Sequence, residues 1–552
     1  MPAAAFLRTT SEKHAALRDP RVNKRRPGQV KHMDWSLTVL AAVMIGFMQA
    51  VNAQTMPPTA ALAVQASPMH KYPRPRASPR RPRKAFAVRA DSRRLPRPPK
   101  RPASIPREEL PTIASSSIYD ASSDTSLLKP LRTNLMRLCN GESSVPVDVL
   151  HLGDSHTAGD VFTGYLRDRF QAEFGAGGRG MLPAGVPFKY YRPRQLKVSR
   201  KQSWQHQNSV RRKASGPFGI TGFRAIGNKA NQRLVLVSRT PDPFEMFKVE
   251  VRTRKDGGAL NVMIGDAPVA TLSTRTTTYP HRSNGEFAHW TEPLRTRNGR
   301  SLPYVEHTFS VPRGARKVEV WPAGDGPVEL LSWSLRGGRP GVLYHSQGVV
   351  GASAEIVKRW DRALVRAELS RLKPGLVLLA YGTNEGFNDR LDLSKYRHSV
   401  RRILRTLREA APYAAFAIAA PPDAARMPKH CPRSARKTAS CRPLSRSEKL
   451  NYQKLIRAKS PDLCRWHAPP NLSRVRGVMA ELANDEGYFY WDWSEVMGAS
   501  CGIEGWVKRK PKLAHGDRVH LTNRGYKRSA DSLYKALRGD ARCQRAAILS
   551  AN

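Results

Sequence analysis

The stretch Val147–Asp160, which reads VDVLHLGDSHTAGD, decides the expected fold. Its apolar beginning predicts a short strand that ends at Gly153, and apolar residues at helical spacing follow over Val161–Phe174. Ser155 therefore stands between a strand and a helix, where open α/β sheets bind their ligands. Gly-Asp-Ser alone is a weak signal, because the same residues can simply cap a helix. Partners elsewhere in the chain must decide between a helix cap and a nucleophile.

The same alternation of strand and helix resumes after residue 337. The continuous apolar run Gly375–Ala380 is typical of a strand that is buried on both faces. Further strands are expected at 343–346, 414–420 and 488–492, and helices at 352–372, 394–410, 472–483 and 522–537. This order predicts a doubly wound parallel sheet of the flavodoxin-like kind.

Residues 195–336 differ, because strands follow one another there without helices. The expected strands are Arg233–Arg239, Met246–Arg254, Ala259–Asp266, Val305–Val311, Lys317–Trp321 and Glu329–Leu335. Alternating apolar and polar residues separated by turns predict an all-β sandwich inserted into the α/β domain. Trp290 and Trp321 in its loops would suit stacking on sugars. The alternative is a structural insert that only shapes the cleft.

The N-terminal region resembles an export signal followed by a linker. Leu37–Met48 is an uncharged apolar run with Lys and Arg upstream and small residues up to Ala53. The run is short for a membrane span, so cleavage after Ala53 is expected and an uncleaved inner-membrane anchor is the alternative. Residues 54–117 are rich in Arg and Pro and are expected to be disordered. We therefore expect a periplasmic or secreted protein.

The expected domain organisation follows from these segments. It comprises a signal peptide at 1–53, a basic linker at 54–117, an α/β domain in two parts at 118–194 and 337–545, and the β-sandwich at 195–336.

The chain is strongly basic, with a formal net charge of +50 over 552 residues. Such a field attracts polyanions, including nucleic acid, acidic glycans and anionic membrane surfaces. No nucleic-acid-binding motif accompanies the charge, so specific nucleic-acid binding is not expected. We expect the basic N-terminal region to contact anionic envelope polymers. A basic surface that is merely solvated is the alternative.

The six cysteines agree with export, since disulfides persist in oxidising compartments. They form no CxxC pair and have no zinc-like spacing with His, so no metal or other cofactor is expected. Cys431 and Cys441 bracket a loop rich in Pro, Arg and Ser, and we expect them to pair locally.

Partners for Ser155 occur in three later segments. Asp517 and His520 lie on a loop before the final helix, where the carboxylate can orient the imidazole as a base. Asn384 follows the apolar strand Gly375–Ala380 and can donate its amide to a developing oxyanion. Gly351 can offer a backbone N–H, with Gly348 as its rival, and the Ser155 N–H is the third donor.

In this order, these blocks resemble the SGNH (GDSL-type) hydrolases. The resemblance implies Ser155 as nucleophile, His520 as base, Asp517 as its orienting carboxylate, and Ser155, Gly351 and Asn384 as the oxyanion hole. Two departures stand out. His156 replaces the usual Leu and has no assigned task, and Gly-Thr-Asn-Glu replaces the commoner Gly-x-Asn-Asp.

A narrower resemblance is to Gram-negative peptidoglycan O-acetylesterases with a carbohydrate-binding-like β-module. It rests on HLGDSHTAGD, Tyr190–Arg192, Trp491–Gly498 and the expected insert. It implies removal of acetyl from the C6 hydroxyl of N-acetylmuramic acid, with acetylated peptidoglycan as the partner. The alternatives are an esterase of another polysaccharide or of lipids, and a non-catalytic wall-binding protein. His151, Trp491 and Trp493 are expected in the core.

Overall fold

The computed structural model describes residues 125–240, 244–275 and 281–543. The expected signal peptide at 1–53 and linker at 54–117 lie outside these ranges. No helix within them has both the length and the apolar character needed to cross a membrane.

The centre of the α/β part is a parallel sheet with the order β15-β1-β16-β17-β18. Numbered by their place in the chain, these strands have the flavodoxin-like order 2-1-3-4-5, which confirms the expected fold class. The strands are β1 (Val147–Gly153), β15 (Val342–Gly348), β16 (Leu376–Ala380), β17 (Ala415–Ala419) and β18 (Phe489–Trp491).

Both faces of this sheet are buried, which explains the continuous apolar strands. In β16, Leu376 and Leu378 belong to one apolar core, whereas Val377 and Leu379 belong to the other. The first core is covered by α1 (Lys129–Cys139), α3 (Phe162–Phe174) and α13 (Asn523–Arg538). The second is covered by α4 (Arg362–Leu372), α6 (Leu393–Ala410) and α10 (Pro470–Glu486).

Two antiparallel sheets lie between β1 and β15 in the chain. One has the order β10-β11-β12-β7-β14-β5-β4, with β2 also paired to β14, and the other has the order β3-β6-β13-β8-β9. Their bounds are β2 (Gly178–Leu182), β3 (Leu196–Lys201), β4 (Gln205–Asn208), β5 (Phe223–Gly227), β6 (Arg233–Ser238), β7 (Met246–Arg252), β8 (Ala259–Ile264), β9 (Ala267–Ser273), β10 (His281–Arg282), β11 (His289–Arg295), β12 (Ser301–Ser310), β13 (Lys317–Pro322) and β14 (Val328–Arg336). The two sheets share one apolar core, as the alternating residues predict.

The antiparallel sheets are joined to the α/β part by more than their chain connections. Leu364 of α4 packs with Leu331 of β14 and Tyr304 of β12. β2, which precedes residue 195, pairs with β14. The expectation that Trp290 and Trp321 lie in loops is wrong, because they lie in β11 and β13. The Arg233 guanidinium lies 4.0 Å from the Trp321 ring centroid, so one face of that ring is already covered.

The helix expected over 352–372 is interrupted. A 3-10 turn, η3 (Ala354–Arg359), is followed by α4, whose start is capped by the Asp361 carboxylate accepting the Leu364 N–H at 2.9 Å. The Asp361 cap therefore separates the two elements. Other short helices are η2 (Thr125–Leu128), α2 (Ser155–Ala158), α5 (Thr383–Gly386), α7 (Arg433–Thr438), α8 (Arg446–Leu450), α9 (Tyr452–Arg457), η4 (Pro461–Leu463), α11 (Trp493–Val496) and α12 (Gly502–Lys508).

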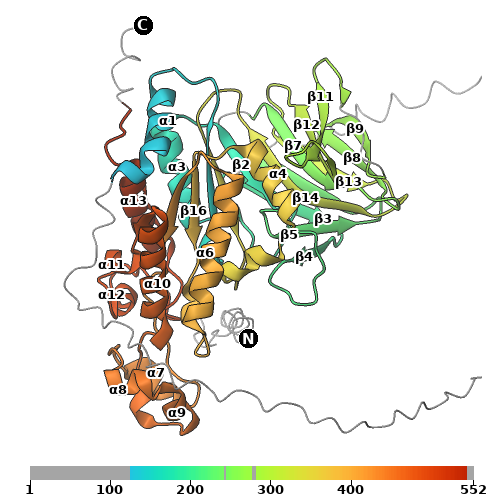
Figure 1. Ribbon diagram of the computed structural model, residues 1–552. Helices are drawn as coiled ribbons and strands as arrows, with labels where there is room; N and C mark the ends of the chain where they lie inside the picture. Colours follow the sequence, from blue (N-terminus) through green and yellow to red (C-terminus); the bar gives the residue numbers. More distant parts are fainter. Residues whose placement is uncertain (1–124, 241–243, 276–280, 544–552) are drawn as a thin grey trace, which may run out of the picture. The chain divides into compact units, whose positions relative to one another are not determined.

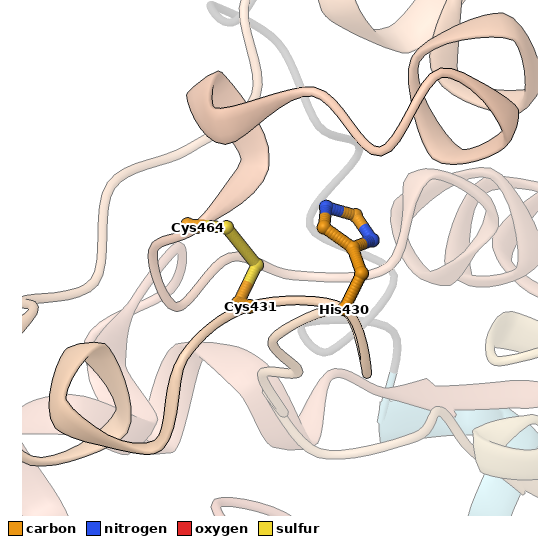
Figure 2. A group of neighbouring side chains, drawn as sticks. All are labelled: His430, Cys431 and Cys464. Atoms are coloured by element: carbon orange, nitrogen blue, oxygen red, sulfur yellow. A yellow bond between two sulfur atoms is a disulfide. The ribbon is translucent and has the colours of Figure 1, made fainter.

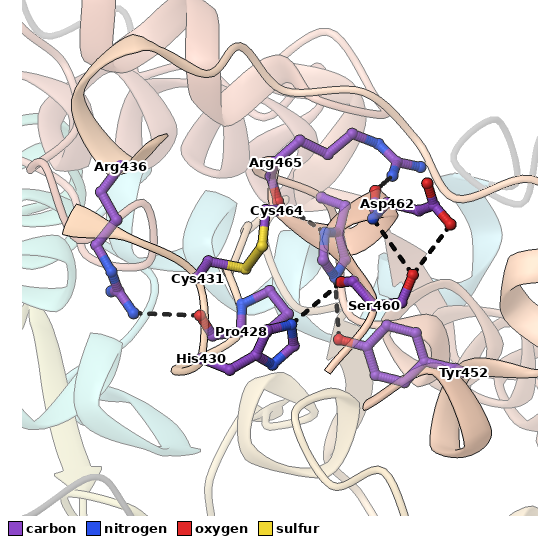
Figure 3. The surroundings of a disulfide bond; sticks show 10 residues. Pro428, His430, Cys431, Arg436, Tyr452, Ser460, Asp462, Cys464 and Arg465 are labelled. Atoms are coloured by element: carbon purple, nitrogen blue, oxygen red, sulfur yellow. Dashed lines mark hydrogen bonds between the residues drawn. A yellow bond between two sulfur atoms is a disulfide. The ribbon is translucent and has the colours of Figure 1, made fainter. Parts of the chain in front are cut away.

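The expected local pair between Cys431 and Cys441 is wrong. The disulfides are Cys139–Cys543, Cys431–Cys464 and Cys441–Cys501. Helix α7 occupies the loop between Cys431 and Cys441, and a β-bridge sets Cys441 beside Trp466. Each cysteine therefore meets a partner distant in the chain. Figure 3 shows Cys431 bonded to Cys464.

Candidate active site

The candidate residues meet at the carboxyl edge of the parallel sheet. Ser155 follows β1, and Asn384 follows β16, which is the neighbour of β1. In a sheet of this order, successive strands are added to one side of β1 and then to the other, so the strand order reverses between β1 and β16. Ligands bind in the crevice outside the carboxyl ends of the strands at such a point. The fold thus brings together residues that are more than two hundred positions apart in the chain.

Ser155, His520 and Asp517 form a continuous hydrogen-bonded line. The Ser155 Oγ lies 3.2 Å from the His520 Nε2, and the His520 Nδ1 lies 2.8 Å from the Asp517 Oδ2. The other Asp517 oxygen accepts the backbone N–H groups of Val519 and His520, each at 3.0 Å. The carboxylate is therefore fixed by its own loop and holds the imidazole with one nitrogen toward the serine.

The charges around His520 favour its role as a proton acceptor. Burial by itself lowers the pKa of the His520 imidazole, but the hydrogen bond and charge of Asp517 outweigh it and raise the pKa above the ordinary value. Burial likewise raises the pKa of the Asp517 carboxyl, but His520 lowers it to about 2. Asp517 is therefore ionised at neutral pH and stabilises an imidazolium when one forms.

A buried network supports the serine turn from behind. The His151 Nδ1 lies 2.8 Å from the Tyr344 hydroxyl, and its Nε2 lies 3.2 Å from the Thr157 hydroxyl. His151 is fully buried, as expected, and burial lowers the pKa of its imidazole to about 3. A Cβ at Gly153 would come within 2.1 Å of the Thr157 hydroxyl. Glycine is thus required where the strand meets the turn.

Asp154 caps the turn, as one interpretation of Gly-Asp-Ser predicts. Its carboxylate accepts the His156 N–H at 3.0 Å. Burial raises the pKa of the Asp154 carboxyl to about 6, even though this hydrogen bond and the charge of His520 lower it. Asp154 holds the short helix, while Ser155 directs its hydroxyl to His520.

The three expected oxyanion donors lie in the first turns of α2 and α5 and in the turn after β15. Ser155 begins α2, where the N–H has no partner within the helix. The Asn384 Nδ2 donates to the Ala352 carbonyl at 2.8 Å, which places the amide beside Gly351. Gly351 has a φ of +76°, and no heavy atom lies within 4 Å of where its Cβ would be.

Gly348, the rival of Gly351, has a packing role. It is buried opposite Gly153 at the end of β15. A Cβ there would lie 2.2 Å from the Ala158 backbone nitrogen, so the absence of a side chain lets α2 pack on the strand.

Glu385, which stands where Asp is commoner in the resembling family, makes two backbone hydrogen bonds. One carboxylate oxygen accepts the Ala354 N–H at 2.7 Å, and the other accepts the Gly382 N–H at 3.1 Å. Burial raises the pKa of the Glu385 carboxyl to about 7. Glu385 thereby ties the turn that carries Asn384 to the loop that carries Gly351.

His156 packs behind His520. Its Nδ1 lies 2.9 Å from the Tyr526 hydroxyl, and its ring centroid lies 5.4 Å from that of His520. Burial and the charge of His520 lower the pKa of the His156 imidazole to about 3, so it is neutral beside the base. No local pattern indicates a task for His156, because its partner Tyr526 lies on the distant helix α13. Trp491 and Trp493 are buried, as expected, and Trp493 flanks His156.

One group of side chains in the described part has the spacing of a metal site. It consists of His430, Cys431 and Cys464 (Figure 2). Both sulfurs are joined in a disulfide, so neither is a thiolate ligand. The His430 Nε2 lies 3.2 Å from the Ser460 carbonyl, as Figure 3 shows. These residues form a structural cross-link and do not fit a metal.

Comparisons with known proteins bear on the fold. No family model matches the chain, and no curated protein matches its sequence. The chain is similar to a solved peptidoglycan O-acetylesterase at 21% identity, over 74% of this chain and 95% of that chain, with a TM-score of 0.54. An active-site mutant of a family two carbohydrate esterase from Clostridium thermocellum matches at 11% identity, over 62% and 98%, with a TM-score of 0.24.

Proposed function

The chain has the fold of the SGNH hydrolases, and from this premise we propose that it is a serine esterase that removes O-acetyl groups from a cell-wall glycan. The observation that carries the proposal is the line Ser155–His520–Asp517, with distances of 3.2 Å and 2.8 Å. A serine is a weak nucleophile until a base takes its proton, and this geometry supplies the base and its orienting carboxylate.

The proposed reaction proceeds through an acyl-enzyme. The Ser155 Oγ attacks the acetyl carbonyl while the His520 Nε2 takes its proton, and the Ser155 N–H, Gly351 N–H and Asn384 amide stabilise the oxyanion. The tetrahedral intermediate collapses as the bond to the sugar oxygen breaks, and His520 returns the proton to that oxygen, which leaves as a hydroxyl. Water activated by His520 then attacks the acetyl-Ser155 ester and releases acetate.

We propose acetylated peptidoglycan as the substrate, with cleavage at the C6 hydroxyl of N-acetylmuramic acid. The support is the likeness to the peptidoglycan O-acetylesterase, 95% of which is covered. The three disulfides support export to the periplasm or the medium, where such a substrate lies.

Acetate release tests this proposal. The purified protein is incubated with O-acetylated peptidoglycan and, in parallel, with acetylated xylan. Faster release from peptidoglycan is expected, and the Ser155→Ala variant should release none above background. Equal rates on both polymers would overturn the peptidoglycan assignment. Failure to release acetate from either polymer or from an aryl acetate would overturn the esterase proposal.

A further inference from the structure

A long connection follows β17 and borders the candidate active site. Residues 421–469, here called the basic subdomain, contain α7, α8, α9 and η4 and end where α10 begins. Connections between a strand and a helix usually span only a few residues. Figure 1 shows α7, α8 and α9 grouped together, away from the antiparallel sheets.

The basic subdomain has little apolar core of its own. Leu444, Tyr452 and Leu463 form a small buried cluster. Cys431–Cys464 closes the subdomain internally, and Cys441–Cys501 joins it to the segment before α12. Covalent links are the usual support where a small unit cannot bury enough apolar surface. The fold therefore maintains a defined surface here rather than a loose loop.

That surface carries cations without carboxylate partners. Among the described residues, no carboxylate forms an ion pair with its exposed basic side chains. These are Lys429, Arg433, Lys437, Arg442, Arg446, Lys449, Lys454, Arg457 and Lys459. Its partly buried Glu448 is already engaged by Arg465 at 2.7 Å. Asp462 is the one exposed acid among the described residues of the subdomain, so its surface carries nine exposed cations and a single exposed carboxylate and is strongly positive.

Helix α6 shows that this is not the rule for basic surfaces of this protein. Its Arg397 pairs with Glu481 at 2.7 Å, and Arg401 pairs with Glu486 at 3.1 Å. Both acids lie on the adjacent helix α10. Arginines of α6 therefore have carboxylate partners on the neighbouring helix, whereas the exposed cations of the basic subdomain have none among the described residues.

The subdomain touches both loops that carry candidate catalytic groups. The Ala425 N–H donates to the Arg518 carbonyl at 2.9 Å, and the Arg518 guanidinium lies 3.9 Å from the Trp466 ring centroid. Arg518 lies between Asp517 and His520. On the other side, Arg426 donates to the Phe387 carbonyl at 3.2 Å, just after the turn that carries Asn384. The subdomain therefore adjoins the loops on both sides of the candidate site.

We propose that the basic subdomain binds carboxylate groups of an anionic glycan polymer and holds the strand whose ester is cleaved at Ser155. The inference rests on the proposed function and adds a binding surface to it. Exposed ammonium and guanidinium groups each contribute little alone, but together they attract and orient a polyanion. Their effect should therefore appear in KM for a polymer and should weaken with salt.

Two matched triple variants test the binding surface. The test variant replaces Lys449, Lys454 and Arg457 with Gln. The control replaces Arg137, Lys373 and Lys535, exposed cations at the ends of α1, α4 and α13 near the opposite edge of the sheet. Both lose the same charge. In the test variant the ratio of kcat/KM on O-acetylated peptidoglycan to that on an aryl acetate should fall about tenfold at low salt. The control should keep this ratio. An equal fall in both variants, or none in the test variant, would overturn the inference.

A binding assay separates this inference from the esterase proposal. Each triple is combined with Ser155→Ala, and the protein that sediments with peptidoglycan sacculi is measured at low and high salt. Salt-sensitive binding that the test triple weakens supports the surface, even if the parent enzyme releases no acetate. Binding to DNA but not to sacculi, or sacculus binding indifferent to the test triple, would overturn it while leaving the esterase proposal intact.

Discussion

Two Asp–His pairs lie at the parallel sheet among the described residues, and one of them faces a serine hydroxyl. At the carboxyl edge, His520 binds Asp517 at 2.8 Å. Between β1 and β15, His345 binds Asp148 at 2.7 Å. The second nitrogen distinguishes them. His520 Nε2 faces the Ser155 hydroxyl, whereas His345 Nδ1 accepts the Met181 N–H at 2.8 Å.

The comparison shows that an Asp–His hydrogen bond does not by itself make the histidine available as a base. In His345 the acceptor nitrogen is occupied by a backbone donor, and the ring is buried. In His520 the acceptor nitrogen is directed at a hydroxyl, and the side chain is partly exposed. The chemistry depends on what the second nitrogen meets, so the two pairs should respond differently to the same substitutions.

Ser155→Ala should give the largest effect. Removing the hydroxyl leaves His520 without a proton to take, and kcat/KM for an aryl acetate should fall by about 10⁴-fold or more. The thermal midpoint should change little, because the side chain is small and partly exposed. Residual activity within tenfold of the parent would contradict the assignment.

The Asp517→Ala and Asp148→Ala variants compare the two pairs directly. Losing Asp517 leaves His520 without its orienting acceptor, and kcat should fall roughly 10³- to 10⁴-fold. Losing Asp148 leaves a buried His345 N–H unpaired, at a cost of about 1–3 kcal/mol in the free energy of unfolding, with activity near that of the parent. Steady-state kinetics and urea denaturation measure both. A similar loss of activity in the two variants would refute the distinction.

The pH dependence should report His520. The base must be neutral, and its pKa is raised above 6.5, so kcat/KM should decrease as the pH falls through a midpoint above that value. In Asp517→Asn the charge of Asp517 is lost, and burial is then opposed only by the smaller effect of the Asp154 charge, so the midpoint should move to lower pH. Rates of both proteins from about pH 4 to 9 test this. A profile that is flat to about pH 4 would exclude His520 as the base.

His156→Leu should have the smallest effect. The neutral His156 ring packs against His520, and Leu keeps an apolar side chain there but loses the 2.9 Å contact with Tyr526. We expect a loss of about 1 kcal/mol in stability and less than tenfold in kcat/KM. The matched change His520→Leu should instead abolish activity. A comparable loss in both variants would give His156 a direct role.

The parts of the fold that could be predicted are those with a local signal. The strand Leu376–Ala380 is apolar at every position because both faces are buried, and that pattern is visible in the sequence. The Asp517–His520 spacing is equally local, because both residues lie on one loop. The order of these segments then sufficed to expect a doubly wound sheet with Ser155, Asn384 and His520 at one edge.

The parts that could not be predicted depend on distant contacts. Cys441 pairs with Cys501, and a β-bridge to Trp466 positions Cys441. No residue pattern near Cys441 predicts that β-bridge. His156 has no local partner, since Tyr526 arrives from α13. The Glu385 bond to Ala354 likewise joins two loops. The break in the helix at Asp361 did have a local signal, the capping residue itself.

We propose that Ser155 is a nucleophile and that His520 activates it. The most direct test is covalent labelling with a serine-directed fluorophosphonate, followed by mass spectrometry of the proteolysed protein. The parent should carry one adduct on the peptide that contains Ser155, and His520→Ala should react far more slowly. An adduct on another residue, or an active protein that carries no adduct on Ser155, would show that Ser155 is not the nucleophile.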